Sequence, residues 1–307
     1  MDRIIIPAPL RPGSRIAIIS PASIVKEEYI DGAVDFLRGK GYEPVAMPYA
    51  KGPADGCYAA SADRRLEDFN TAWNDPRFDA VLCARGGYGT AHLLPGLSGE
   101  FLRNRPKWLI GFSDISALHA ALLHAGVASI HGPMAKHLCE NPDNDASSAL
   151  MSLLSGGRMD YEVPTHELSR RGEGSGRLVG GNLAVLNGLA STPYDAFALA
   201  SREDIILFLE DVSEAIYAVE RMLWRLYLAG TLHKVKGIIF GQFTDYRPSA
   251  KYSTMEDMLD SLLQSVGPLG IPVAFGFPVG HVDDNLPMVE GAKVTLSVGD
   301  TTRLIQI

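Results

Sequence analysis

Residues 108–126 (WLIGFSDISALHAALLHAG) pass from a strand pattern to a helix pattern within a few residues. This change limits the chain to folds in which a strand leads directly into a helix. The apolar run 108–110 predicts the end of a buried strand, and apolar side chains then recur at helical spacing, at Ile115, Leu118 and Leu122. Ser113 is therefore expected at the turn, beside helix N-terminal N–H groups that have no partner within the helix.

Ser113 has two interpretations at this position. Its hydroxyl stands where a nucleophile would, because unpaired N–H groups at a helix N-terminus stabilise a developing oxyanion. It also stands where an N-cap would, which is the commoner role of a serine before a helix. Residues 111–115 (GFSDI) lack the second glycine of the G-x-S-x-G turn of α/β-hydrolases. This stretch alone favours the cap, and a nucleophile would need partners elsewhere in the chain.

Strand and helix patterns alternate through the first half of the chain. Buried strands are predicted at 15–20, 44–47, 79–83 and 127–130, and helices at 27–38, 62–73 and 143–155. This alternation predicts the α/β class, with a mostly parallel sheet flanked by helices and with ligands beyond the carboxyl ends of the strands. Both the glycine-rich residues 84–89 (ARGGYG) and Ser113 follow such strand ends.

The second half of the chain is predicted to form a separate, smaller domain. With 307 residues, 46% of them hydrophobic, the chain is long enough for two buried cores. Residues 165–176 are rich in charge, serine and glycine, which is typical of a linker. We therefore predict an N-terminal α/β domain over 1–160, a linker over 161–177 and a C-terminal domain over 178–307. In that domain we expect helices starting near 178–182, 216 and 255, and strands at 204–209, 235–240, 273–275, 293–297 and 303–307, so that its end is β-rich.

The glycine loop 86–89 has a functional and a structural interpretation. Glycines let a backbone turn with positive φ and approach a ligand closely. The spacing is neither G-x-G-x-x-G nor a Walker loop with its lysine, so a phosphate site is weakly indicated and a tight strand-to-helix turn explains the loop equally well. Arg85 is either a surface charge or a partner for a carboxylate.

Charge and cysteine content exclude several classes of partner. The net charge of −8, with no run of Lys or Arg, argues against nucleic acid and anionic membranes. The three cysteines are too scattered for a metal site or a disulfide framework, which favours a reducing compartment. No stretch approaches transmembrane length, and the first apolar triplet is too short for a signal sequence. We expect a cytoplasmic protein that acts on a small molecule or a peptide.

A nucleophilic serine needs a histidine base and a carboxylate that orients it. His119 lies about 9 Å further along the same predicted helix, at about 1.5 Å per residue, and is turned away from Ser113. His131 follows a predicted strand and His281 lies in a glycine-rich loop, and spacing does not rank one above the other. For the acid, Glu210 ends an apolar strand. Its neighbour Asp211 has the D-x-x-E spacing of a helix-capping pair with Glu214.

With these residues in view, the chain resembles the LD-carboxypeptidases, the muramoyltetrapeptide carboxypeptidase family of serine peptidases. The resemblance covers nearly the whole length. It rests on six segments in this order: 84–89 (ARGGYG), 109–116 (LIGFSDIS), 130–133 (IHGP), 180–183 (GGNL), 209–212 (LEDV) and 280–281 (GH).

The resemblance implies a site and a reaction. It implies a Ser113–His281–Glu210 triad in a cleft between the two domains, an oxyanion hole formed by the N–H of Asp114 and that of Gly86 or Gly87, and a homodimer. His131 then has a structural or substrate-side role. The reaction is hydrolysis of the amide between an L-centre, diaminopimelate or lysine, and the terminal D-Ala of a murein tetrapeptide or nucleotide-linked muropeptide in wall recycling. No metal or organic cofactor is needed. Arg85 is the candidate for binding the terminal carboxylate.

Two alternatives remain at this point. A microcin C-type self-immunity peptidase resembles the same family, but such members carry a longer, aromatic-bearing loop before the second domain. Here residues 156–176 contain only Tyr161 as Phe, Tyr or Trp, which favours the murein substrate. The second alternative is a non-catalytic protein that binds nucleotides or wall peptides through the loop 86–89 as an anion nest.

Overall fold

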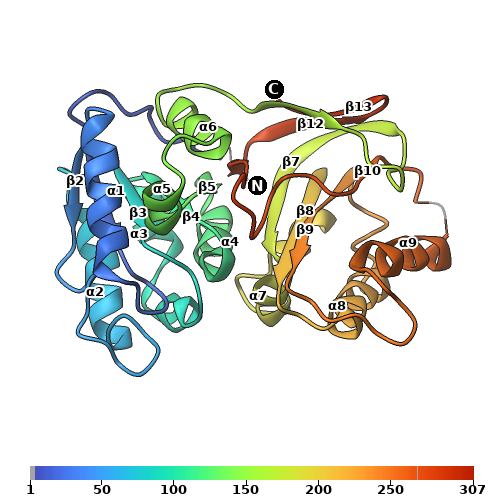
Figure 1. Ribbon diagram of the computed structural model, residues 1–307, viewed down its shortest axis with the longest axis horizontal. Coiled ribbons are helices and arrows are strands. Elements are labelled where there is room, and N and C mark those ends of the chain that lie inside the picture. The colour runs from blue at the N-terminus through green and yellow to red at the C-terminus, as the bar shows by residue number, and fades with distance from the viewer. Residues whose placement is uncertain (1–3, 268) are drawn as a thin grey trace. The chain divides into compact units, whose positions relative to one another are not determined.

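The computed structural model describes residues 4–267 and 269–307, and this part of the chain divides into two compact units. Residues 4–158 together with Asp283–Gly291 form one, which we call the N-terminal unit. Met159–Val282 and Ala292–Ile307 form the other, which we call the C-terminal unit. Each unit contains its own sheet (Figure 1). The α/β class that we predicted, with a mostly parallel N-terminal sheet, is confirmed.

The N-terminal unit is built on a six-stranded sheet in the order β11-β5-β4-β3-β1-β2. Five strands run parallel, and only β11 is antiparallel to its neighbour β5. The strands are β1 (Arg15–Ile19), β2 (Glu43–Ala46), β3 (Ala80–Cys83), β4 (Trp108–Gly111), β5 (Ser129–His131) and β11 (Met288–Glu290). Every residue of β3 and of β4 is buried, as expected of parallel strands covered on both faces.

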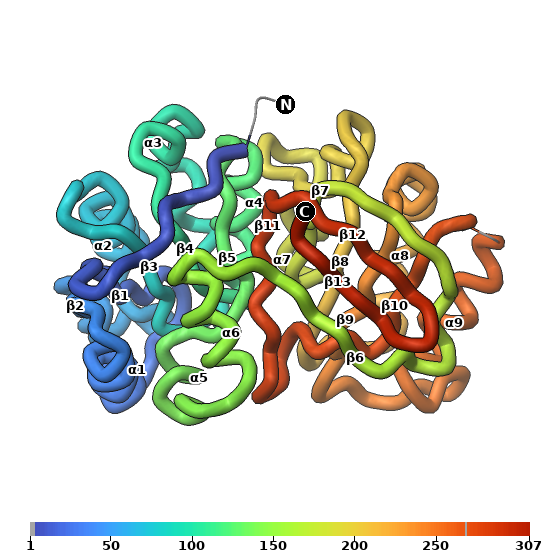
Figure 2. The backbone as a smooth tube through the Cα atoms, turned by 90° about the horizontal axis from the view of Figure 1, so that it is seen from above, coloured from blue at the N-terminus to red at the C-terminus, as the bar shows by residue number. Residues whose placement is uncertain are grey.

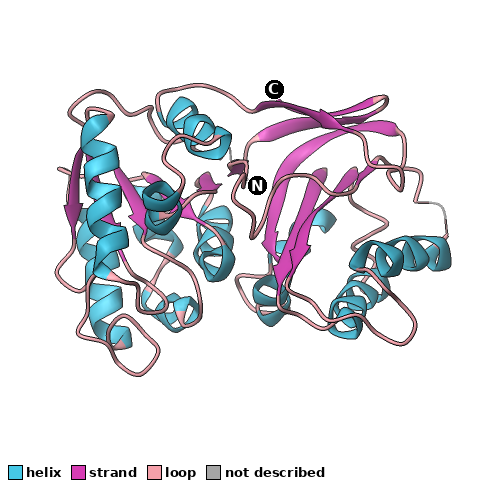
Figure 3. Cartoon of the chain, viewed as in Figure 1, coloured by secondary structure: helices cyan, strands magenta, loops and turns pink. Residues whose placement is uncertain are grey.

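Helices cover this sheet (Figure 3). They are α1 (Glu27–Gly39), α2 (Ala62–Asn74), α3 (Gly99–Asn104), α4 (Ser116–Ala125), α5 (Ala135–Glu140) and α6 (Asp145–Leu154), with 3₁₀ turns η1 (Thr90–Gly96) and η2 (Ser113–Ile115). α1 packs against α5, and α3 packs against α4. The carboxyl ends of β3 and β4 lead into the glycine loop and into Ser113, so two adjacent parallel strands bring these segments together.

The C-terminal unit is built on a seven-stranded mixed sheet in the order β10-β9-β8-β7-β12-β13-β6. Its strands are β6 (Asp160–Pro164), β7 (Gly172–Asn182), β8 (Ile205–Val212), β9 (Gly237–Thr244), β10 (Val273–Ala274), β12 (Lys293–Val298) and β13 (Thr301–Gln306). β7 to β10 are parallel, whereas β12, β13 and β6 form an antiparallel edge that can be followed in Figure 2. This edge is the β-rich end that the sequence indicated.

The helices of the C-terminal unit are α7 (Leu183–Gly188), α8 (Ile216–Leu228) and α9 (Met255–Val266), with the 3₁₀ turn η3 (Ala196–Ser201). Two of them, α8 and α9, start where the sequence pattern predicted. The four apolar residues at helical spacing on α8 are all buried, namely Ile216, Val219, Leu223 and Leu226. Thr254 and Asp257 form a reciprocal capping box that starts α9. Among the described residues, no helix is both long and apolar enough to cross a membrane.

Two expectations about the middle of the chain need correction. The predicted linker 161–177 contains most of β6 and the first part of β7, so it belongs to the sheet of the C-terminal unit. The helix expected from 178–182 is instead the end of β7, and α7 follows it. The prediction failed because glycines are common in loops, and this segment contains Gly172, Gly174 and Gly176. A side chain at Gly174 would meet the Lys236 carbonyl oxygen at 2.0 Å, so the strand needs glycine there.

Candidate active site

Ser113 lies at a strained turn between β4 and α4. Phe112 is extended, and Ser113 then adopts φ 65°, a left-handed conformation that a side chain disfavours. Such strain persists where the surrounding structure imposes it and is typical of active sites. The N-cap positions of η2 and α4 are occupied by Phe112 and Ile115. Ser113 is therefore not an N-cap, which was the role that its own stretch of sequence favoured.

The glycine loop contacts Ser113 directly. A Cβ atom added to Gly86 would lie 2.8 Å from Ser113 Cβ and 2.9 Å from Ser113 Oγ, so only glycine fits there. Gly87 has φ 113°, and a Cβ there would lie 2.3 Å from Ser23 Oγ. Ser23 also bonds to the loop: its N–H donates to the Gly86 carbonyl at 3.4 Å, and its hydroxyl accepts the Tyr88 N–H at 3.1 Å. Gly86 thus lets the loop backbone approach Ser113 closely, and Gly87 lets it approach Ser23.

Asp114 ties the serine turn to the end of the same loop. Its side chain is buried, and Oδ2 accepts the N–H of Thr90 at 2.8 Å. Burial raises the pKa of this carboxyl, and the bond from Thr90 opposes that shift. The Asp114 side chain therefore has a structural role. The backbone N–H of Asp114 lies in the 3₁₀ turn η2 that begins at Ser113.

His119 and His131 are buried behind the serine turn. His119 Nε2 donates to the Gly111 carbonyl at 2.8 Å, so Nδ1 accepts the hydroxyl of Ser129, also at 2.8 Å. Burial lowers the pKa of His119 to about 4, which keeps the ring neutral. The ring of His131, on β5, is fully buried 5.7 Å from that of Phe112. Both histidines are core residues, consistent with a structural role for His131.

In the C-terminal unit, Glu210 and His281 form a hydrogen-bonded pair. Glu210 Oε2 accepts from His281 Nδ1 at 2.8 Å. The glutamate side chain is completely buried, whereas that of His281 is 21% exposed. Because a carboxylate only accepts, His281 Nδ1 carries the proton of this bond. The pair has the arrangement of a general base with its orienting acid.

Two backbone features lie beside Glu210. The register between β8 and β9 shifts between Leu209 and Asp211, and such a bulge redirects the side chains of a strand. Gly280 has φ 128°, and a Cβ there would lie 2.9 Å from Glu210 Cβ and 3.0 Å from Glu210 Oε2. A side chain at position 280 would therefore crowd Glu210.

Asp211 has a different structural role from the predicted one. We expected Asp211 and Glu214 to cap a following helix, but Asp211 lies in β8 and the N-cap of α8 is Ala215. Asp211 instead accepts the N–H of Ala184 at the start of α7, together with those of Asn182 Nδ2 and Val212. Burial, reinforced by the charge of Glu210, raises its pKa to about 7.

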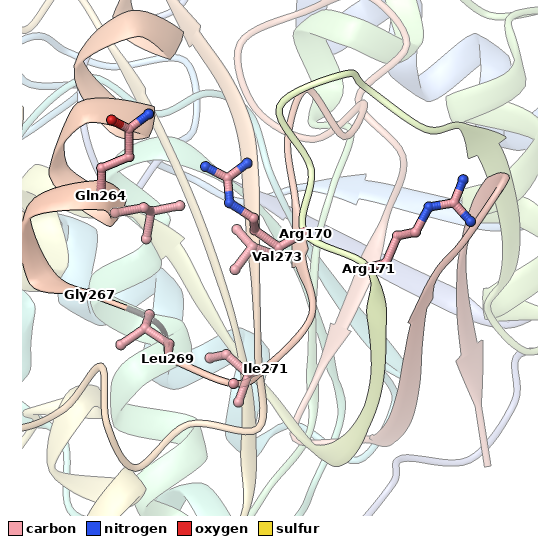
Figure 4. Close-up of a pocket in the computed structure, with 9 residues that line it drawn as sticks. Arg170, Arg171, Gln264, Gly267, Leu269, Ile271 and Val273 are labelled. Carbon is pink, nitrogen blue, oxygen red and sulfur yellow. The ribbon is translucent and has the colours of Figure 1, made fainter.

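Arg85 lies on the surface of the N-terminal unit, where its Nη1 donates to the Ile24 carbonyl at 3.1 Å. A cavity of about 570 Å³ in the C-terminal unit is lined by none of the predicted site residues. Figure 4 shows this cavity between α9 and the segment just before β7, which carries Arg170 and Arg171. These two arginines already pair with Asp260 and Asp300. In the described part of the chain, no three His, Cys, Asp or Glu side chains gather as a metal site would.

Comparison with known proteins identifies the family. Residues 16–132 match the model for the LD-carboxypeptidase N-terminal domain, and residues 175–296 match that for the LD-carboxypeptidase C-terminal domain. The chain belongs to the LD-carboxypeptidase family of serine peptidases. Within it, the chain is similar to the murein tetrapeptide carboxypeptidase of Pseudomonas aeruginosa, with 34% identity over 92% of each chain. It is thus a carboxypeptidase of the LD type, related to murein tetrapeptide enzymes.

Solved structures agree with this placement. The muramoyltetrapeptide carboxypeptidase of Oxalobacter formigenes superposes with a TM-score of 0.84 and 30% identity, covering 96% of this chain and 99% of that one. The microcin C7 self-immunity protein MccF, in complex with glutamyl sulfamoyl guanosine, has a TM-score of 0.86 at 23% identity and covers 98% of each chain. The second likeness extends to the fold alone.

Proposed function

We propose that this enzyme hydrolyses the amide between an L-centre, diaminopimelate or lysine, and the terminal D-Ala of murein tetrapeptides during cell-wall recycling. The observation that carries the proposal is the 2.8 Å bond from His281 Nδ1 to the buried carboxylate of Glu210. This bond orients the His281 ring, which we assign as the base, and the family relationship supports Ser113 as the proposed nucleophile. The similarity to the murein tetrapeptide carboxypeptidase supports the choice of substrate.

In the proposed mechanism, His281 Nε2 takes the proton of Ser113 as Oγ attacks the carbonyl carbon of the L-centre. Glu210 stabilises the imidazolium that forms. The N–H of Asp114 and an N–H of the glycine loop bind the oxyanion. His281 then protonates the amine of D-Ala, which leaves, and a water molecule activated by His281 hydrolyses the acyl-enzyme. The chemistry requires neither a metal nor an organic cofactor.

Two N–H groups of the glycine loop are already occupied and are not candidates for binding the oxyanion. The Tyr88 N–H is already bonded to Ser23 Oγ, and the Thr90 N–H to Asp114. Gly86 has the closest approach to the Ser113 side chain. We assign the second donor to Gly86 or Gly87. Arg85, with its exposed guanidinium, is the proposed partner of the terminal D-Ala carboxylate.

Murein peptides are favoured over microcin-type nucleotides for a specific reason. The only Phe, Tyr or Trp within 156–176 is Tyr161, which lies in β6 and pairs with Leu304 of β13. That segment therefore offers a sheet edge and no aromatic loop for stacking on a base. Identity to the microcin C7 self-immunity protein MccF is 25%, below the 34% to the murein tetrapeptide enzyme.

The test is release of D-Ala from three substrates: tetrapeptide, pentapeptide and nucleotide-linked tetrapeptide. Wild-type enzyme is expected to release D-Ala from the tetrapeptides, and Ser113→Ala to lose on the order of 10⁶-fold in kcat while remaining folded, as removal of a triad serine does. Tight binding of the tetrapeptide without turnover would instead support the non-catalytic alternative, in which Ser113→Ala changes nothing chemical.

Assembly and compartment are the remaining parts of the proposal. On the family relationship we propose that the enzyme works as a homodimer in the cytoplasm, where wall fragments are recycled. Light scattering of the purified protein would give a dimer mass, and a monomer mass at working concentration would contradict this part alone.

A further inference from the structure

One peptide group of the glycine loop is held from both sides by buried charged side chains. Arg65 Nη1 donates to the Gly89 carbonyl oxygen at 2.9 Å, and the Thr90 N–H of the same peptide group donates to Asp114 Oδ2 at 2.8 Å. Arg65 is 2% exposed and Asp114 is 5% exposed. The Gly89–Thr90 peptide group therefore lies between a guanidinium and a carboxylate that are both removed from water. We call these two side chains and the peptide group the clamp.

Arg65 is anchored from several segments of the N-terminal unit. Besides Gly89, it donates to the carbonyls of Ala60, before α2, and Pro21, after β1. The Tyr58 ring covers its guanidinium, 5.0 Å from ring centre to Cζ. Burial lowers the pKa of Arg65 and raises that of Asp114, and attraction between the two charges opposes both shifts.

A buried charge pair is weak evidence of stabilisation, because the cost of removing each charge from water offsets the attraction. What the clamp does supply is geometry. Each end of the peptide group has a charge-assisted hydrogen bond, which is shorter and stronger than a neutral one. The two bonds therefore fix the orientation of the Gly89–Thr90 peptide group.

Ser113 and the clamp are directly connected. Asp114 is the residue that follows Ser113, and Gly89 closes the loop that begins with Gly86 against Ser113. At its other end the loop is bonded to Ser23 through the Gly86 carbonyl. Gly89 itself has φ 117°, and a Cβ there would lie 2.8 Å from the Tyr58 ring and 3.1 Å from Arg65 Nη1.

We propose that Arg65 and the Asp114 side chain are positioning residues, which hold the Gly89–Thr90 peptide group and thereby fix the glycine-loop N–H groups relative to Ser113. The inference rests on the proposed role of Ser113 as nucleophile. Oxyanion donors work because they are aligned before the reaction starts. A displacement of about 1 Å in such a site costs on the order of 100-fold in rate.

The experiment compares Asp114→Asn, Arg65→Lys, Arg65→Met and the double variant Arg65→Met/Asp114→Asn. Each single change is expected to lower kcat by about 10- to 100-fold while KM stays within about threefold, because the loop acts on the transition state more than on substrate binding. The double variant is expected to be no slower than its slower parent, since both side chains hold one peptide group.

Asp68→Asn is the matched control. Asp68 is 3% exposed in the same unit and also accepts one backbone N–H, that of Tyr49 at 2.9 Å, but it is not bonded to the glycine loop. Its kcat should stay within about twofold of wild type. The proposal is overturned if folded Asp114→Asn has wild-type kcat, if the losses multiply in the double variant, or if Asp68→Asn loses as much. Should Arg65→Met not fold, Arg65→Lys and Asp114→Asn decide the question.

A second measurement separates this inference from the proposed function. The rate at which a fluorophosphonate labels Ser113 depends on the nucleophile and the oxyanion donors, without any murein peptide. If wild-type enzyme is labelled but releases no D-Ala, the substrate is wrong, and the labelling rates of the same variants still test the clamp. The clamp predicts slower labelling in Asp114→Asn and unchanged labelling in Asp68→Asn, and equal rates would contradict it.

Discussion

Ser113 and the Glu210–His281 pair are held in place by different means. In the N-terminal unit the backbone does the positioning: Ser113 sits at φ 65°, and Gly86 packs directly against its side chain. In the C-terminal unit the side chains do it, because Glu210 is fully buried and its carboxylate fixes the His281 ring. The difference teaches that backbone changes should affect the nucleophile most, whereas side-chain changes should affect the acid–base pair.

The largest effects are expected from side-chain removal in the C-terminal unit. His281→Ala removes the base and should lower kcat by on the order of 10⁶-fold, whereas Glu210→Gln keeps the ring in place and should cost about 10⁴-fold. Steady-state kinetics of D-Ala release measures both. Equal losses, or activity retained in His281→Ala, would break the proposed division of roles between the two side chains.

A backbone-level test compares one glycine in each unit. Gly86→Ala places a methyl group against Ser113 and should lower kcat by about 100-fold, as expected for a displaced nucleophile. Gly280→Ala forces a side chain into φ 128° beside Glu210. It should mainly lower the free energy of unfolding, by about 1–3 kcal/mol. Kinetics and urea unfolding of both variants check this. The comparison fails if Gly86→Ala is fully active.

A smaller effect, on KM, is expected from removal of the Arg85 side chain. Arg85→Ala should raise KM for the tetrapeptide by about tenfold, equivalent to about 1.4 kcal/mol, with kcat nearly unchanged, because the charge of the D-Ala carboxylate is the same in the ground state and the transition state and its contact contributes to uniform binding. A matched control is Arg64→Ala, an exposed arginine that lies over the Tyr49 ring. Unchanged KM in Arg85→Ala would exclude the arginine from substrate binding.

The smallest effects are pH slopes of stability, and one buried group in each unit, His119 and Asp211, should contribute slopes of opposite sign. The pKa of His119 falls to about 4 through burial, so its contribution is present above about 6.5 and is lost as the pH falls towards 4. The pKa of Asp211 rises to about 7, so its contribution is full below about 3.9 and is lost as the pH rises through 7.

Urea unfolding from pH 4 to 7 tests both slopes. In the wild-type protein, His119 makes the free energy of unfolding rise with pH, and Asp211 makes it fall. His119→Gln should abolish the first contribution and Asp211→Asn the second, each of up to about 1.4 kcal/mol per pH unit. Slopes of the same sign in the two variants would show that burial does not govern these groups as described.

Much of the fold could be predicted because strands and helices with strong apolar periodicity keep their local preference. α8 and the strands β1, β3 and β4 are of this kind, since burial dictates their patterns. β7 could not be predicted, because its glycines are required by close backbone neighbours on adjacent strands. β11 escaped notice for a related reason: three residues are too short for a periodic signal.

The candidate site divides in the same way. Ser113 follows the apolar strand β4, and Glu210 ends the apolar run within β8, so sequence can indicate both. Spacing left His131 and His281 equal, because sequence does not show that one is sealed in β5 while the other faces a buried carboxylate. Arg65 carries no sequence signal at all, since a charged residue on a helix normally faces water. Only the carbonyls gathered around it reveal that it is buried.

The nine residues Asp283–Gly291 have a consequence for dividing this protein into pieces. They lie between two segments of the C-terminal unit in sequence, yet β11 completes the sheet of the N-terminal unit by pairing with β5. A fragment ending at residue 158 would expose the open edge of β5, a site for unwanted pairing between molecules. Swapping halves between relatives therefore means grafting this short return segment together with the first half.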